Sequence, residues 1–167
     1  MILAIDVYYK EAQAKTVGVL FDWEDDEPQK IITSVIENVE EYVPGQFFKR
    51  ELPCVTDLLN KLDLNTIDLI IVDGHVFVDN QNALGLGGHL YESLQHQIPV
   101  VGVAKRSFHN TEKVSFPVYR GKSGVPLYVS CIGIEIESVI ENIKNMKGEF
   151  RLPAILKIMD QETKKEN

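Results

Sequence analysis

Two aspartates follow apolar, β-branched segments that are typical of strands. Asp6 comes after residues 2–5, and Asp73 comes at the end of residues 67–72. If the two strands are neighbours, both carboxylates project near one edge of a sheet, where ligand sites gather. Two such carboxylates repel each other unless a proton or a cation intervenes, and Mg²⁺ prefers oxygen ligands. The pair predicts a divalent-metal site, although either aspartate alone could simply end a strand or cap a turn.

Lys105 follows a third apolar segment, residues 98–104. If that strand runs parallel to the strand before Asp73, the lysine stands at the same edge of the sheet. A lysine beside a bound phosphate can stabilise the charge that develops during phosphodiester cleavage. The alternative is a solvated lysine at the end of a strand.

Two histidines lie next to glycines. Gly74 and His75 follow Asp73 directly, so the chain can turn sharply while presenting an imidazole, which is more often a local hydrogen-bonding group than a ligand. His89 follows the glycines of residues 85–88, which permit close approach of the backbone. Their spacing is not GxGxxG, so we expect no nucleotide cofactor.

The charge of the chain is unevenly distributed. The net charge of -8 argues against a protein that coats nucleic acid through clustered lysines and arginines. Acidic residues concentrate between positions 22 and 41. By contrast, residues 105–122 carry five basic side chains and one acid, so this segment could face phosphate: Lys105, Arg106, Lys113, Arg120 and Lys122.

The hydrophobic pattern predicts an alternation of strands and helices. The leucines between residues 52 and 62 recur at helical spacing, with Pro53 expected in the first turn of that helix. Strands are expected at 2–7, 16–21, 31–39, 67–74 and 98–104, a hairpin at 115–131, and helices at about 52–62, 82–95 and 135–147.

This order predicts an α/β protein with a ribonuclease H-like mixed sheet. Three antiparallel strands come first, parallel strands follow, and helices flank the sheet, with the first strand beside the fourth. We expect a single domain over residues 1–160 and a frayed tail over residues 161–167.

Cysteine content and the first residues bear on location. Cys54 and Cys131 lack the spacing of a zinc site and are expected to be buried thiols. The N-terminal residues have no basic segment and reach Asp6 early, so we expect neither a signal peptide nor a membrane span. A cytoplasmic monomer is the expectation.

Several motifs together resemble the endonuclease V family, which acts on nucleic acid containing deaminated purines, notably inosine. They follow the family order along almost the whole chain: AIDVYY around Asp6, YVPGQFFKREL from Tyr42, LIIVDGH ending at His75, GLGGHL around His89, VGVAKR around Lys105, PLYVS from Pro126 and RLP from Arg151.

The resemblance implies a metal-dependent endonuclease that hydrolyses the phosphodiester one bond beyond the lesion, on its 3′ side. Mg²⁺, or Mn²⁺ as a substitute, would be held by carboxylates, and Lys105 would contact the scissile phosphate. The implied metal ligands are Asp6, Glu51 and Asp73, with Asp160 nearest to the position of a family histidine. The implied nucleic-acid contacts are a strand-separating wedge of Tyr42, Val43, Pro44 and Gly45, together with Gly74, His75 and His89.

The chain also departs from the family pattern. Val76 follows Gly74-His75 where the family has glycine, residues 79–81 replace an HPR motif, and a helical segment usual at the start of the family is not in this sequence. We therefore expect a divergent, N-terminally short member. The alternatives are a weak or inactive member that binds nucleic acid, or another ribonuclease H-like nuclease or phosphotransferase. The choice between DNA and RNA stays open.

Overall fold

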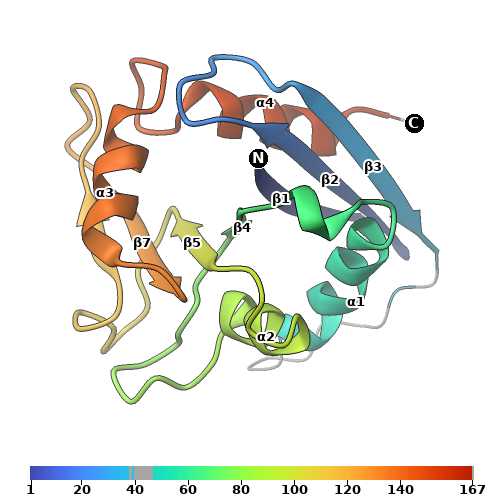
Figure 1. The fold of residues 1–167 in the computed structure, drawn as a ribbon, viewed down its shortest axis with the longest axis horizontal. Helices are drawn as coiled ribbons and strands as arrows, with labels where there is room; N and C mark the ends of the chain where they lie inside the picture. Colours follow the sequence, from blue (N-terminus) through green and yellow to red (C-terminus); the bar gives the residue numbers. More distant parts are fainter. Residues whose placement is uncertain (38, 40–46, 167) are drawn as a thin grey trace.

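A mixed seven-stranded sheet forms the centre of the computed structural model, which describes residues 1–37, 39 and 47–166 (Figure 1). The order of strands across it is β3-β2-β1-β4-β5-β7-β6. Strands β1, β4 and β5 run parallel to one another, and all other neighbours are antiparallel. The bounds are β1 Ile2–Lys10, β2 Gln13–Phe21, β3 Lys30–Ile36, β4 Leu69–Asp73, β5 Val100–Ala104, β6 Phe116–Val118 and β7 Leu127–Ile132. The first strand lies beside the fourth, which confirms the predicted ribonuclease H-like architecture.

Strand β1 has different partners along its two edges. It pairs with β2 from Ile2 to Lys10, but its parallel pairing with β4 extends only to Ile5, which lies opposite Val72. The strand expected at residues 2–7 is therefore longer than predicted and extends past Asp6 to Lys10. The strand continues because the hairpin partner β2 is as long as β1. Asp6 instead marks the point where β1 separates from β4.

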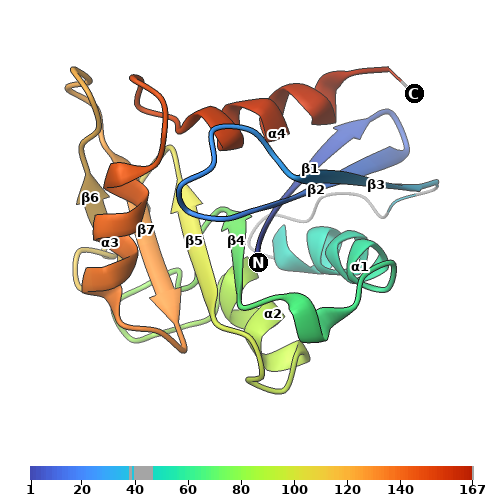
Figure 2. The same ribbon diagram turned by 45° about the horizontal axis from the view of Figure 1, so that its top comes forward.

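Helices cover both faces of the sheet, as Figure 2 shows with α4 on one side and α1 and α2 on the other. Side chains alternate between the two faces along each strand, so each face has its own apolar core. Ile71 and Val103 pack towards α3 and α4, whereas Ile70 and Val100 pack towards α1 and α2. The helices are α1 Phe47–Leu59, α2 Leu86–Ser93, α3 Ile136–Asn145 and α4 Ala154–Lys164, with a short 3₁₀ turn, η1, at Leu64–Thr66.

Two helices differ from the sequence-based expectation. Helix α1 already includes Phe47, so Pro53 lies inside it and not in its first turn. Its ring is tolerated on the exposed side of the helix while Val55 and Leu58 on the other side are buried. Helix α4 corrects the expectation of a frayed tail from residue 161, because it continues to Lys164 and buries Thr163 against the sheet.

Both cysteines have free thiols. Cys54 is buried, as expected, and Cys131 is only partly buried. Within residues 1–37, 39 and 47–166, no helix combines the length and the apolar character that crossing a membrane requires.

Candidate active site

The strand register brings Asp6 and Asp73 together. Ile5 and Val72 are the last paired residues of β1 and β4, and the two aspartates follow them directly. Both lie on the face of the sheet that α4 covers, since side chains two residues apart share a face and Ala4 and Ile71 pack in that core. The predicted pairing of the two carboxylates at one edge of the sheet is therefore present.

Lys105 and Asp160 complete a pocket around this pair. Lys105 follows the last residue of β5, on the same face as Val103, and Asp160 comes from α4. All four polar side chains line one pocket of about 360 Å³ of empty space, counting its open mouth. The rest of its lining is apolar: Ile71, Val72, Val103, Leu127, Leu152, Leu156 and Met159. The pocket thus holds its charged groups against a hydrophobic floor.

Burial and repulsion act on both aspartates. Burial, followed by the charge of Asp73, raises the pKa of Asp6 to about 7, and the amide of Val7 partly opposes this by donating to Asp6 Oδ1 at 2.9 Å. Asp73 reaches solvent at the mouth of the pocket, but desolvation by the surrounding protein still raises its pKa, while Lys105 opposes the rise. Protonated Asp6 donates a hydrogen bond to Asp73. The pair therefore shares a proton near neutral pH.

Glu51 approaches the pair from the opposite face of the sheet. It sits in α1, is 7% exposed, and does not line the pocket of Asp6 and Asp73. Burial, with the charges of Asp6 and Asp73, raises its pKa to about 9. The carboxylate of Glu51 therefore interacts electrostatically with those of Asp6 and Asp73, near the point where β1 and β4 separate. The resemblance pointed to Glu51, but no rule about strand ends could have found it.

A cation–π contact stands beside Glu51. The guanidinium carbon of Arg50 lies 3.6 Å from the centre of the Tyr9 ring, on the α1 side of β1. Burial, then the charge of Glu51, raises the pKa of Tyr9, so its phenol stays neutral. The contact holds the first half of α1 against β1. It thereby fixes the position of Glu51, the residue that follows Arg50.

Asp160 lies between two lysines. Its Oδ1 is 3.9 Å from Nζ of Lys105, and its Oδ2 is 3.1 Å from Nζ of Lys164, one helical turn later in α4. The sequence-based reasoning missed Lys164 because it expected no helix there. The signal was the four-residue spacing of Ile155, Met159 and Thr163, which are buried.

Arg151 fixes the backbone that carries Lys105. Its Nη2 donates to the carbonyl of Lys105, and its Nε donates to the carbonyl of Pro126 at 3.1 Å. The arginine of the RLP motif thus ties the segment before α4 to the ends of β5 and β7. This restrains the main chain of Lys105, while its ammonium, 3.9 Å from Oδ1 of Asp160 on a side chain 49% exposed, stays accessible to a ligand.

The carboxylates suit a divalent cation by their chemistry. Hard cations take oxygen ligands, and a cation would relieve the desolvation and repulsion that raise the pKa values of Asp6, Asp73 and Glu51. Over the described part of the chain, no three side chains of His, Cys, Asp or Glu already stand close enough to hold an ion. Ligation by three of these residues would therefore require side-chain movements.

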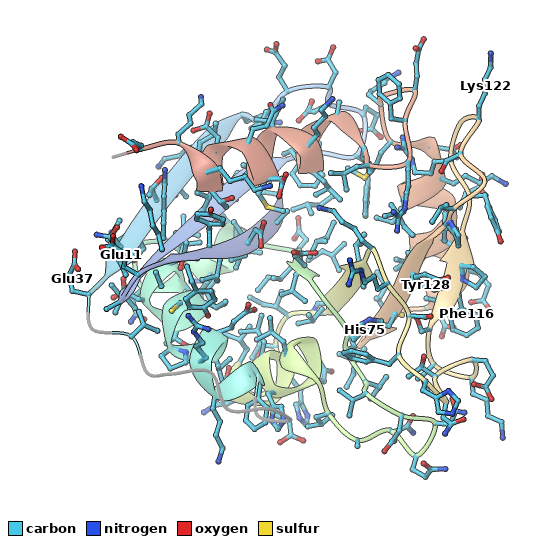
Figure 3. All side chains as sticks on the ribbon, turned by 180° about the vertical axis from the view of Figure 1, so that it is seen from behind. Glu11, Glu37, His75, Phe116, Lys122 and Tyr128 are labelled. Carbon is cyan, nitrogen blue, oxygen red and sulfur yellow. The ribbon has the colours of Figure 1, made fainter. Side chains whose placement is uncertain are left out.

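His75 anchors the loop after Lys105 and lies outside the pocket. It is 6% exposed, its Nε2 is 2.9 Å from the carbonyl oxygen of Arg106, and its ring stacks on Phe108 at 4.2 Å. Burial lowers its pKa, so the ring is neutral and donates through Nε2. Gly74, before it, has a φ of 145°, a conformation that favours glycine. Figure 3 shows His75 beside the ends of β4 and β5.

The glycines before His89 let the start of α2 approach the segment after β4 closely. The amides of Gly85, Gly87 and Gly88 donate to carbonyls of His75 and Val76 at 2.8–3.2 Å. The backbone amides at the start of α2 are therefore hydrogen-bonded to the segment after β4. The ring of His89 stacks on Phe48 of α1 at 3.7 Å and does not reach the pocket. The predicted contacts of Gly74, His75 and His89 with nucleic acid stay predictions.

The basic side chains of segment 105–122 differ in exposure. Arg120 is 3% exposed and donates to carbonyls including those of Met146 and Phe150, at 2.5 Å each, so it is structural. Lys122, by contrast, projects from the tip of the β6–β7 loop (Figure 3). The predicted wedge, Tyr42, Val43, Pro44 and Gly45, lies outside the described residues.

Comparison with known proteins gives a consistent result at the sequence level. A family model described as Endonuclease V matches residues 1–161. Endonuclease V of Pyrococcus horikoshii is 32% identical over 167 residues, covering 98% of this chain and 72% of that protein. Endonuclease V of Thermus thermophilus is 29% identical over 181 residues, covering 94% of this chain and 78% of that protein.

Solved structures share the fold. The crystal structure of human ENDOV has a TM-score of 0.75 at 21% identity, with 97% of this chain and 82% of that chain covered. Endonuclease V of Ciona intestinalis, solved with a 24mer DNA containing an inosine followed by a ribo-adenosine, has a TM-score of 0.77 at 17% identity, with 97% and 83% covered.

Proposed function

Because the chain belongs to the endonuclease V family, we propose that it is a metal-dependent endonuclease that hydrolyses a phosphodiester 3′ to inosine in a nucleic-acid strand. The observation that carries the proposal is the convergence of Asp6, Asp73, Lys105 and Asp160 on one pocket. Two carboxylates that share a proton and a lysine with an exposed ammonium are suited to a site where an anionic substrate and a cation meet.

Asp6 and Asp73 would hold Mg²⁺ or Mn²⁺, with Glu51 reaching it from α1 and Asp160 from α4. When bound, the cation supplies an activated water and neutralises the oxygen that leaves. Asp6 must first give up the proton that it shares with Asp73, and the neighbouring Lys105 favours the charged form of Asp73. The carboxylates therefore act as ligands only once they are ionised.

Lys105 would act on the phosphate itself. Its main chain is restrained by Arg151, and its ammonium lines the same pocket as the two aspartates. A positioned cationic donor stabilises the negative charge that grows on the phosphoryl oxygens as water adds to phosphorus and the 3′-oxygen leaves. The products are a 3′-hydroxyl and a 5′-phosphate, and the protein works as a monomer in this proposal.

A cleavage assay tests the proposal. Matched DNA and RNA strands, with and without one inosine, are incubated with the protein and Mg²⁺, Mn²⁺ or a chelator. We expect a nick one bond beyond inosine with either metal and none with the chelator. Asp73→Asn should abolish it, while Asp26→Asn, at an exposed position in the β2–β3 turn, should not. Absence of inosine-dependent cleavage with both metals would overturn the proposal.

One observation favours a second candidate function, binding without turnover. Asp160 is already paired with Lys105 and Lys164, and among the described residues no three carboxylates stand together at ligand spacing. A protein that retains an inosine-containing strand in a mobility-shift assay but leaves it uncut with both metals would be a binding member of the family.

A further inference from the structure

A lysine-rich groove continues from the candidate active site along the β1–β2 hairpin. It lies between the hairpin and the last turn of α4, with about 770 Å³ of empty space counting its open side. Its lining is Tyr8, Lys10, Gln13, Lys15, Thr163, Lys164, Lys165 and Glu166. Four lysines in one groove stand out on a chain whose net charge is -8.

The groove and the carboxylate pocket are built from the same two elements. One face of β1 carries Asp6, Tyr8 and Lys10, because side chains two residues apart in a strand share a face. Each step of two residues spans about 7 Å. On α4, Asp160 in the pocket and Lys164 in the groove are one turn apart and joined by an ion pair of 3.1 Å. A strand of nucleic acid leaving the pocket in this direction therefore meets the lysines next.

The floor of the groove is fixed by a buried lysine. Lys15 is 9% exposed, and its Nζ donates to the carbonyl of Lys165, just after α4, at 2.8 Å. This bond holds the end of the helix above the hairpin and keeps a positive charge beneath the groove. A cation at the carbonyl end of a helix is also favoured by the helix dipole.

The other lysines can exchange their partners for phosphate. Lys10 pairs with Glu166 at 3.4 Å, and Lys165 pairs with Glu162, but each lysine side chain is 63% exposed. Ion pairs at such exposed positions are weak. A phosphate diester can thus replace the carboxylates with little loss.

We propose that this groove binds the phosphate backbone of the substrate strand on one side of the cleavage site. The proposal rests on the proposed function and adds the direction in which the strand leaves the pocket. The groove ends where the surface turns acidic: Glu11 and Glu37 lie together at the outer end of the hairpin (Figure 3), and Gln13 donates to Glu37 at 2.7 Å. The bound stretch is therefore short.

The test is a double variant, Lys10→Gln with Lys165→Gln, compared with the matched double variant Lys144→Gln with Lys147→Gln. The control pair is exposed, removes the same charge, and lies on and just after α3, over the opposite end of the sheet (Figure 1). Binding of an inosine-containing single strand is measured in an Asp73→Asn background at several salt concentrations. Thermal unfolding checks that both variants are folded.

We expect the groove variant to bind about tenfold more weakly at low salt, and the slope of log affinity against log salt to shrink by about 0.7 for each phosphate that is no longer neutralised. In the otherwise native protein, KM should rise while kcat stays constant. If wild-type protein cuts the strand but the groove variant binds and cuts like the control, the groove inference is overturned and the proposed function stands. A wild-type protein that neither binds nor cuts overturns both.

Discussion

The ammonium of Lys105 lies 3.9 Å from Oδ1 of Asp160, so the end of β5 and helix α4 meet inside the candidate site. The pair joins the residue proposed to contact phosphate to the residue that the resemblance placed nearest to a family histidine. Whether Asp160 serves the lysine or the metal is the first question that the site poses.

Changing Asp160 separates these two roles. If Asp160 is a ligand, Asp160→Asn should raise the Mg²⁺ concentration needed for half-maximal cleavage by roughly 10- to 100-fold, whereas Asp160→His, which restores a ligand, should raise it much less. Metal titrations of cleavage measure both values. An unchanged metal requirement in Asp160→Asn would instead assign the aspartate to positioning Lys105 and Lys164.

Lys105 should matter for turnover more than for binding. Lys105→Gln removes a charge that strengthens its contact as the phosphate becomes more negative, so kcat should fall about 100-fold with a small change in KM. Lys113→Gln, at an exposed position in the same basic segment, should change neither by more than about twofold. Steady-state kinetics on one inosine-containing strand compares them. Equal defects in the two variants would argue against a specific role for Lys105.

The stability of the metal-free protein should depend on pH through Glu51 and Asp6. Their folded pKa values, about 9 and about 7, exceed the values of 4.5 and 3.8 that they have without the fold. The folded state therefore holds extra protons, so their stabilising effect is full below about pH 4, declines as the pH rises above the unfolded values, and is lost once the pH has passed through 7 and 9. Thermal unfolding in chelator should show Tm falling across that window.

Glu51→Gln should flatten this dependence on pH because it removes the group with the larger rise in pKa. Glu27→Gln, at an exposed position, is the control and should leave the pH profile unchanged. Added Mg²⁺ should raise Tm most at alkaline pH, where the ligands are ionised. A metal-free Tm that stays constant from about pH 5 to about pH 9 would contradict the buried carboxylate cluster.

Gly102 tests the packing beneath the site. A Cβ there would stand 2.6 Å from the carbonyl oxygen of Gly74 and 2.8 Å from Oγ of Ser130. Gly102→Ala should therefore cost about 1–3 kcal/mol of unfolding free energy and displace the residue that follows Asp73. Gly124→Ala, where a Cβ would meet no atom within 4 Å, should be nearly neutral. Urea denaturation measures both, and similar values for the two would rule out this account of Gly102.

The central strands and the pairing of Asp6 with Asp73 were predictable because buried parallel strands leave long apolar runs in the sequence. Helix α4 was missed because its signal is weak: its second half carries only Met159 and Thr163 as buried residues among charged neighbours. Glu51 reaches the site from the other face of the sheet, and such an approach depends on how α1 packs, which spacing alone does not encode.

In the proposed metal site, the separation of β1 from β4 after Ile5 would make metal affinity depend on the docking of both helical layers. Asp6 and Asp73 need only the sheet to form, but Glu51 joins them only when α1 has docked on one face and Asp160 only when α4 has docked on the other. A chain with the sheet formed but neither helix docked would hold two of the four proposed ligands, and a chain with one helix docked would hold three. Tight metal binding would then indicate that both helical layers are docked. A variant that loosens either layer should show a lower metal affinity before it unfolds.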